Sequence, residues 1–325
     1  MANVLVLGGT SWLGGEIAKA AFAREHNVTC LARGEAGDVP AGATFIRADR
    51  VDPDAYADVL DERWDAVFEV SWQPRFVRGA VEALGHIASH WTYVSSVSAY
   101  LDQSVGGDED AELAEPIDAE QAGWEDYPGA KVRCEQIVQT LAHTLIARVG
   151  LLGGPGDRSD RFGYWVSRFA LAGDGPVLVP DSPEQPAQIL DARDLAVWLV
   201  EAGTSKTTGI FNAVGEQSTL GQMIDVAAEV AGFTGDKVPA DADWLSEHDV
   251  QPWSGPRSLP IWVPDHDGMG SKSGRAVAAG LRRRPLERLL EETLGYERSL
   301  GLDRERRAGL TREEERELID QVRAR

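Results

Sequence analysis

A tyrosine and a lysine four positions apart have the spacing needed for proton-transfer chemistry. They are Tyr127 and Lys131 in the segment YPGAK, and a separation of four residues places both side chains on one face of a helix. A free tyrosine has a pKa of about 10, roughly three units too high for proton transfer at neutral pH, and a nearby ammonium lowers it. The pair therefore predicts an acid/base group, although an isolated pair of this kind is also common on surface helices.

A glycine-rich turn near the N-terminus predicts a dinucleotide site. The spacing Gly8-x-x-Ser11-x-x-Gly14 follows the apolar run Asn3–Leu7 and precedes a helical pattern. A strand, a tight turn and a helix present backbone N–H groups and the positive end of the helix dipole to a phosphate. Ser11 stands where a middle glycine is expected. It is small enough for pyrophosphate to approach, and its hydroxyl could donate a further hydrogen bond. A plain tight turn is the alternative.

Two charged positions bear on which dinucleotide binds. Arg33 ends the second predicted strand, where an arginine can pair with the 2′-phosphate of NADP and an acidic residue would select NAD. Asp49 follows the third predicted strand, where a carboxylate can accept from the adenine amino group. The alternatives are an exposed surface arginine and an acidic residue at the start of a helix.

Three serines end the predicted strand that precedes the tyrosine and lysine. Ser95, Ser96 and Ser98 come at the end of an apolar run that starts at Trp91. Ligands of open α/β sheets gather at the carboxyl ends of the strands. A serine hydroxyl there can hold a substrate oxygen beside the phenol, and Lys131 can bind the nicotinamide ribose. We predict hydride transfer between nicotinamide and a substrate carbon while Tyr127 moves the proton.

Alternating strands and helices must position these groups. This order over residues 1–150 predicts a parallel α/β sheet with right-handed crossovers. The predicted strands are Asn3–Leu7, Val28–Ala32, Thr44–Arg47, Asp65–Val70, Trp91–Ser95 and Thr144–Val149. The predicted helices are Trp12–Arg24, Pro53–Leu60, Arg75–Ala88 and Tyr127–Ala142.

The pattern is less regular after Gly150. Short strands are predicted at Val177–Val179, Gln188–Leu190 and Ile210–Ala213, and helices at Phe162–Ala172, Asp194–Glu201 and Leu220–Ala231. The charged tail Thr311–Arg325 predicts a solvated surface helix. We therefore expect a dinucleotide-binding domain over residues 1–150 and a mainly substrate-binding lobe over residues 151–325, with some chain returning to the first sheet.

Composition narrows the class of protein. The 325 residues carry a net charge of −21, from 32 basic and 53 acidic side chains, which disfavours nucleic-acid and membrane partners. Two cysteines form no disulfide framework and no zinc spacing, so we expect a cytoplasmic protein. No signal peptide and no membrane span are predicted. The cluster Asp265-His266-Asp267 is a weak metal candidate, and we predict no metal site.

Taken together, these motifs resemble an extended short-chain dehydrogenase/reductase of the NAD(P)-dependent epimerase/dehydratase type, in its atypical branch. The resemblance spans about residues 3–215 and rests on the segments Gly8–Gly14, Tyr93–Ser96, Tyr127–Lys131, Arg148–Pro155 and Asp191–Ala196. It implies a Rossmann-like doubly wound parallel sheet with a smaller C-terminal α/β substrate lobe. It also implies that Ser96, Tyr127 and Lys131 are catalytic, Ser96 being the serine that matches the family pattern.

The resemblance extends to binding residues. The predicted cofactor-binding residues are Gly8, Thr10, Ser11, Trp12, Leu13, Gly14, Arg33, Asp49, Arg50, Ser71 and Lys131. The predicted substrate-binding residues are Trp72, Ser96, Trp124 and Arg193. Trp72 stands where family members carry small residues, so it either walls the pocket or packs in a core. Arg161, Arg168 and Arg193 are candidates for binding a diphosphate, or surface ion pairs.

The prediction is an NADP-dependent oxidoreductase, with NAD as the alternative cofactor, acting on a carbonyl or hydroxyl group of a small molecule. One alternative is a nucleotide-sugar epimerase or dehydratase. The other is a non-catalytic NADP-binding regulatory relative associated with RNA, which the charge of −21 disfavours. A homodimer is left open. The sequence does not identify the substrate or the direction of the reaction.

Overall fold

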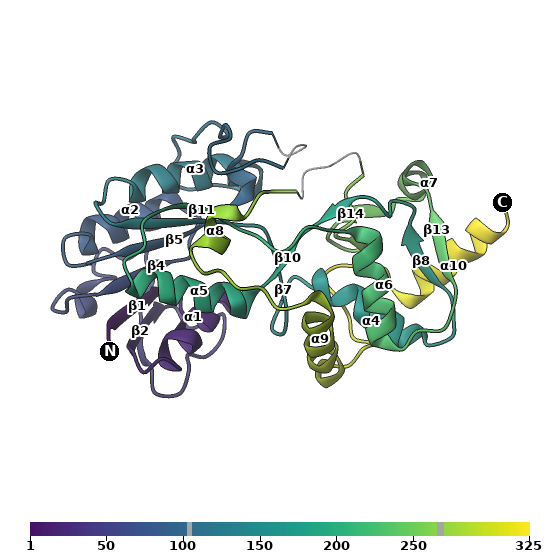
Figure 1. Cartoon of the computed structure of the whole chain (residues 1–325), viewed down its shortest axis with the longest axis horizontal. Coiled ribbons are helices and arrows are strands. Elements are labelled where there is room, and N and C mark those ends of the chain that lie inside the picture. Colours follow the sequence, from purple (N-terminus) through teal and green to yellow (C-terminus); the bar gives the residue numbers. More distant parts are fainter. Residues whose placement is uncertain (103–105, 265–269) are drawn as a thin grey trace. The chain divides into compact units, whose positions relative to one another are not determined.

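The computed structural model describes residues 1–102, 106–264 and 270–325, and the chain forms two compact units (Figure 1). The first unit comprises Met1–Gly150, Ala192–Gly215 and Ser271–Arg283. The second comprises Leu151–Asp191, Glu216–Gly270 and Arg284–Arg325. The chain therefore crosses between the units more than once, and each unit is described by itself.

The first unit is built on a seven-stranded parallel sheet with the order β11-β6-β5-β4-β1-β2-β3. Its strands are β1 Asn3–Leu7, β2 Asn27–Ala32, β3 Thr44–Arg47, β4 Ala66–Glu69, β5 Trp91–Ser96, β6 Thr144–Val149 and β11 Gly209–Ala213. The order reverses between β1 and β4, which makes the sheet doubly wound and Rossmann-like. Ligands of such sheets bind at this reversal, beyond the carboxyl ends of the strands.

Helices cover both faces of this sheet, which explains why its central strands β1, β4, β5 and β6 are buried along almost their whole length. The helices are α1 Trp12–Phe22, α2 Pro74–Leu84, α3 Tyr127–Val138, α5 Ala192–Thr204 and α8 Gly274–Ala278. The pair α1 and α5 packs together on one face, and the pair α2 and α3 packs together on the other (Figure 1). The predicted strands are confirmed to within one or two residues. The predicted helices Trp12–Arg24, Arg75–Ala88 and Tyr127–Ala142 extend too far at their C-terminal ends, whereas the predicted helix Asp194–Glu201 is shorter than α5.

The predicted helix Pro53–Leu60 is wrong. Only the single 3₁₀ turn η1, Ala57–Val59, forms there. The backbone bonds of the segment join residues three apart, as in Ala55 N to Asp52 O and Ala57 N to Asp54 O, so the chain makes successive tight turns. The apolar pattern covers too few residues to sustain a longer helix.

The second unit contains short strand pairs and five helices within its described residues. The pairs are β7 Leu151–Gly153 with β10 Ile189–Asp191, β8 Val177–Pro180 with β13 Lys237–Ala240, β9 Pro186–Ala187 with β12 Ser218–Thr219, and β14 Gln251–Trp253 with β15 Ser258–Pro260. The helices are α4 Phe162–Ala172, α6 Leu220–Ala231, α7 Ala242–Glu247, α9 Leu286–Leu300 and α10 Arg312–Arg323. Helices α4, α6 and α9 pack on one another around an aromatic core that includes Trp165 and Phe169.

The C-terminal helix departs from the prediction of a solvated tail. Thr311 caps α10 by accepting from the Glu314 N–H, and Glu314 bonds back to the Thr311 N–H. Leu318 and Ile319 are buried in the hydrophobic core of the unit. The many charges of the segment made its apolar stripe hard to recognise in the sequence. The stripe is narrow, but it is sufficient to pack the helix against the core of the second unit.

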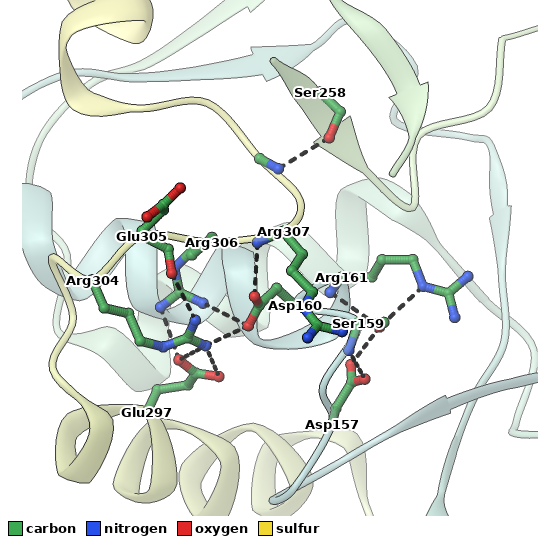
Figure 2. Close-up of polar contacts among 11 residues, drawn as sticks. Asp157, Ser159, Asp160, Arg161, Ser258, Glu297, Arg304, Glu305, Arg306 and Arg307 are labelled. Carbon is green, nitrogen blue, oxygen red and sulfur yellow. Dashed lines mark hydrogen bonds and ion pairs between the residues drawn. The ribbon is translucent and has the colours of Figure 1, made fainter. Parts of the chain in front are cut away.

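A cluster of buried charges joins α9, the segment after it and the start of α4. Figure 2 shows the carboxylates of Asp160 and Glu297 facing Arg304 and Arg306. The Arg307 N–H also donates to Asp160 at 2.8 Å. Asp160 has a positive φ of 61°, a conformation that aspartate tolerates better than most residues. These contacts hold a loop of the second unit in place.

In the part of the chain that the structure describes, no helix is long and apolar enough to cross a membrane.

Candidate active site

The turn between β1 and α1 is stabilised by two glycines and by the side chain of Ser11. Gly8 has a φ of +89°, and a Cβ on Gly14 would lie 2.2 Å from the Gly8 carbonyl oxygen, so both positions require glycine. Ser11 caps α1 by accepting from the Gly14 N–H at 3.2 Å, and its hydroxyl donates to Gly8 O at 2.8 Å. Its one hydrogen is therefore used inside the turn. The additional bond to phosphate expected for this hydroxyl is not available in this arrangement.

A cavity of about 420 Å³ opens beside this turn, within the size range of cofactor sites. It brings together the turn and the carboxyl ends of β1 to β4. Among the predicted cofactor residues, the lining includes Gly8, Thr10, Ser11, Arg33, Asp49, Arg50 and Ser71. The glycine turn at the start of α1 and the polar side chains of the lining fit a dinucleotide.

Four predicted cofactor residues do not line this cavity: Trp12, Leu13, Gly14 and Lys131. Trp12 and Leu13 begin α1 and are half-buried. Lys131 also lies outside the lining, on α3 in the same unit. The cavity thus gathers most of the residues expected around the diphosphate and the adenosine, together with Ser71, but not Lys131.

Arg33 forms an ion pair with Glu35 on the lining of the cavity. Its Nη2 lies 3.2 Å from Oε2 of Glu35, and both side chains are more than half exposed. Glu35 also lines the cavity, and the sequence analysis overlooked it. An exposed pair of this kind contributes little stability, so either group remains able to face a ligand. Asp49 lies on the same lining, with its Oδ1 accepting from the Val51 N–H at 3.1 Å.

A buried ion pair forms part of the cavity wall. Arg50 donates to both carboxylate oxygens of Glu69, at 2.9 and 2.5 Å, and Glu69 is fully buried at the end of β4. Glu69 also accepts from the Ser71 N–H at 2.8 Å, which ties down the backbone after the strand. Burial alone would lower the pKa of Arg50, but Glu69 and Tyr56 together raise it.

The tyrosine and lysine of the predicted acid/base pair occupy the first turns of α3. Pro128 fits the start of this helix because it lacks an N–H that would go unpaired there. The Lys131 Nζ lies 5.7 Å from the centroid of the Tyr127 ring and 5.1 Å from that of Tyr93. It donates to the Val94 carbonyl oxygen at 2.7 Å and is almost fully buried. Lys131 is thereby anchored to β5, with two further donors remaining.

The three serines at the end of β5 have different surroundings. Ser95 donates to Glu135 at 2.5 Å, inside a buried network that includes Arg148. Ser96 caps the 3₁₀ turn η2, Val97–Ala99, by accepting from the Ser98 N–H at 3.1 Å. The hydroxyl hydrogen of Ser96 has no acceptor in these contacts, whereas that of Ser95 is engaged. Ser96 is therefore better suited than Ser95 to donate to a ligand.

Two tryptophans surround the Tyr127 ring. Trp124, from the 3₁₀ turn η3 Trp124–Asp126, stacks on Trp72 with ring centroids 5.1 Å apart. Both rings also contact Tyr127, at 5.3 and 5.8 Å. Trp124 is 79% exposed and Trp72 is half-buried, so neither tryptophan belongs to the buried core. Trp72 and Trp124, two of the predicted substrate-binding residues, therefore lie beside the predicted acid/base group Tyr127.

The remaining candidates lie elsewhere. Arg193 lies on α5 and is half-buried. Arg168 pairs with Glu315 and Arg161 stacks on Trp253, both inside the second unit. The cluster Asp265-His266-Asp267 lies outside the described residues. Within the described ranges, no group of three or more His, Cys, Asp or Glu side chains could hold a metal ion.

Comparison with known proteins identifies the family. The model of the NAD dependent epimerase/dehydratase family matches residues 4–213, so the chain belongs to that family. No curated protein sequence matches the chain.

Solved structures share the fold at low sequence identity. A protein from Burkholderia cenocepacia, provisionally described as an epimerase, is 20% identical with a TM-score of 0.70, covering 92% of this chain and 98% of that one. UDP-glucuronic acid 4-epimerase from Bacillus cereus, solved with NAD, is 16% identical with a TM-score of 0.66, covering 92% and 99%. UDP-glucose 4-epimerase from Thermotoga maritima, solved with UDP-glucose, has the same identity, TM-score and coverage. The similarity establishes a common fold.

Proposed function

We propose that the protein is an NAD(P)-dependent epimerase that oxidises a hydroxyl-bearing carbon of its substrate and reduces the same carbon again. The observation that carries this proposal is the arrangement at the start of α3. Tyr127 and Lys131 lie one helical turn apart beside the end of β5, in the unit that holds the glycine turn. Family membership and solved relatives that include UDP-sugar 4-epimerases support epimerisation over net reduction.

A bound nicotinamide would supply hydride acceptance and donation. The side chains supply the proton chemistry and the positioning. Tyr127 removes the proton from the substrate hydroxyl and later returns it. Lys131 presents a positive charge to the phenol and directs its remaining donors to the ribose hydroxyls. Ser96 donates to the substrate oxygen, which holds that oxygen near the phenol.

Arg33 favours NADP as the dinucleotide. Its guanidinium, more than half exposed on the cavity lining, can pair with a 2′-phosphate once it leaves Glu35. Glu35 opposes this preference because its carboxylate would repel the phosphate. We therefore expect Glu35→Gln to tighten NADPH binding and Arg33→Gln to weaken it, with NADH affected much less. Equal effects on both dinucleotides would contradict the assignment.

The substrate class to test first is a nucleotide sugar. UDP-sugars are named for two of the relatives of similar fold, and epimerisation at a sugar hydroxyl needs only the groups described above. An NADPH-dependent carbonyl reductase is the second candidate, and Arg33 supports it through its preference for NADPH. The two differ in one readout: an epimerase interconverts substrate and product with no net loss of NADPH, whereas a reductase consumes one NADPH for each product formed.

The test of the acid/base role is Tyr127→Phe measured with purified protein, dinucleotide and a panel of UDP-sugars and simple ketones. Loss of general acid/base catalysis should lower kcat about 10²- to 10⁴-fold while the dinucleotide still binds. Tyr296→Phe removes a hydroxyl from α9 in the other unit and should leave kcat unchanged. Turnover that survives Tyr127→Phe would remove the tyrosine from the mechanism.

A further inference from the structure

A second cavity lies in the second unit, well apart in sequence from the dinucleotide turn. It has a volume of about 190 Å³ and lies between the C-terminal end of α4 and the helix α10. Four guanidinium groups and two carboxylates line it, which leaves a formal excess of two positive charges. They belong to Arg168, Arg312, Arg316 and Arg323, and to Glu315 and Asp320. This concentration of arginine is unusual in a protein of net charge −21.

Helix α10 carries its arginines that line the cavity on one face and three of its glutamates outside that face. Arg312, Arg316 and Arg323 recur at intervals of four and seven, which keeps them on one stripe, and this stripe lines the cavity. Glu313, Glu314 and Glu317 do not line it. Only Glu315 and Asp320 of the acidic residues of the helix line the cavity, so half of its four positive charges are uncompensated.

The arginines have spare hydrogen-bonding capacity. Arg168 contacts Glu315 through Nη2, but its Nε and Nη1 are buried without an acceptor. Leaving such donors unpaired is unfavourable, so little opposes a turn of this guanidinium towards an acceptor in the cavity that Arg168 lines. Glu315 is already engaged, because it also accepts from the Leu178 N–H at 3.2 Å.

The exposed arginines are weakly held. Arg312 lies 3.7 Å from Asp303, and Arg323 lies 3.3 Å from Asp236, with both carboxylates largely exposed. Such pairs are screened by solvent and exchange readily. Among the described residues, no ion pair of 4.0 Å or less involves Arg316. These side chains can turn towards an anion without breaking a strong contact.

We propose that this cavity binds a phosphate group. Guanidinium forks match the geometry of tetrahedral oxyanions and bind them through paired, charge-assisted hydrogen bonds. Arg312 and Glu315 come from the first turn of α10, so the positive end of a twelve-residue helix contributes to the same lining. The volume corresponds to roughly six water molecules, enough for a phosphate with a small group attached.

The test is isothermal titration of the full chain with inorganic phosphate at constant ionic strength set by chloride. The wild-type protein should show saturable binding, and Arg316→Gln and Arg323→Gln should each weaken it about tenfold. Both positions are exposed, so these variants should fold. Arg298→Gln removes an exposed arginine from α9 and serves as the matched control, with binding unchanged.

The glycine turn of the first unit is the competing phosphate site, and the variants separate the two. Binding that is identical in the wild type, Arg316→Gln and Arg323→Gln would overturn the proposal, as would the absence of saturable phosphate binding by the wild type in this chloride buffer. A parallel titration with ribose 5-phosphate distinguishes the source of the phosphate group. Tighter binding than inorganic phosphate indicates a phosphomonoester ligand, and equal binding indicates free phosphate.

Discussion

The buried pair of Arg50 and Glu69 makes a quantitative prediction. Glu69 is fully buried, and its carboxylate accepts two bonds from Arg50 and one from the Ser71 N–H. The substitution Glu69→Gln keeps the shape of the side chain but replaces one acceptor by an NH₂ group and leaves the guanidinium uncompensated. Removing one partner of a buried pair typically costs about 3–5 kcal/mol. We expect a loss of this size in the free energy of unfolding.

The assay is urea unfolding followed by circular dichroism, with a double-mutant cycle. Arg50→Met alone should also destabilise, since Glu69 would then be buried without its counter-charge. Arg50→Met combined with Glu69→Leu should lose less than the sum of Arg50→Met and Glu69→Leu measured singly, because no lone charge remains. Glu120→Gln is the matched control: Glu120 pairs with Arg78 at the surface, and its loss should cost under about 1 kcal/mol.

The same substitution bears on the cofactor site. Arg50 and Ser71 line the cavity, so a displaced guanidinium should also weaken dinucleotide binding in Glu69→Gln. A Glu69→Gln protein as stable as the Glu120→Gln control, or a double variant that loses the full sum, would refute the reasoning that this pair organises the wall of the cavity.

Three further predictions follow from local contacts. Ser11→Ala removes the cap of α1 and the bond to Gly8 O, and should cost about 1 kcal/mol of stability in urea unfolding and weaken dinucleotide binding; an unchanged protein would contradict the role of the hydroxyl in the turn. Burial alone would raise the pKa of Asp160, but Arg304 and the Arg307 N–H hold it below its usual value (Figure 2). Its contribution to stability is therefore complete above the ordinary carboxyl pKa and lost as pH falls through the lower folded value. Asp160→Asn, which tolerates the same positive φ, should unfold with a shallower pH dependence below about pH 4 than the wild type, and identical slopes would contradict this. Trp124→Ala should raise KM for the substrate and leave dinucleotide affinity unchanged, and the reverse pattern would exclude Trp124 from the substrate site.

Local patterns in the sequence were sufficient for the main elements of the first unit. The strands are short, largely apolar runs, buried on both faces everywhere except at the edges of the sheet, and the glycine turn follows from spacing and backbone geometry. The helix expected over Pro53–Leu60 does not form, because the chain there closes in three-residue turns. The docking of α10 was missed because Leu318 and Ile319 are few among many charges, and only the tertiary contacts show that they are buried.

The site was predictable in part for the same reason. Residues belonging to the turn and to the strand ends meet at one cavity, as parallel topology requires. The Arg50–Glu69 pair was missed, although a signal existed: Glu69 interrupts the apolar run Ala66–Val70, and a charge in a buried strand needs a partner. Which partner it finds depends on the fold, and no spacing rule connects these two residues. Glu35 was overlooked because exposed acidic residues are common throughout this chain.

The central claim is that Tyr127 and Lys131 face the nicotinamide of a dinucleotide held by the glycine turn. A crystal structure with bound NADP tests it directly. The account predicts pyrophosphate on the turn from Gly8 to Gly14, the Lys131 ammonium bonded to the nicotinamide ribose, and the Tyr127 hydroxyl beside the nicotinamide ring. A dinucleotide bound elsewhere, or a nicotinamide ring directed away from Tyr127, would contradict it.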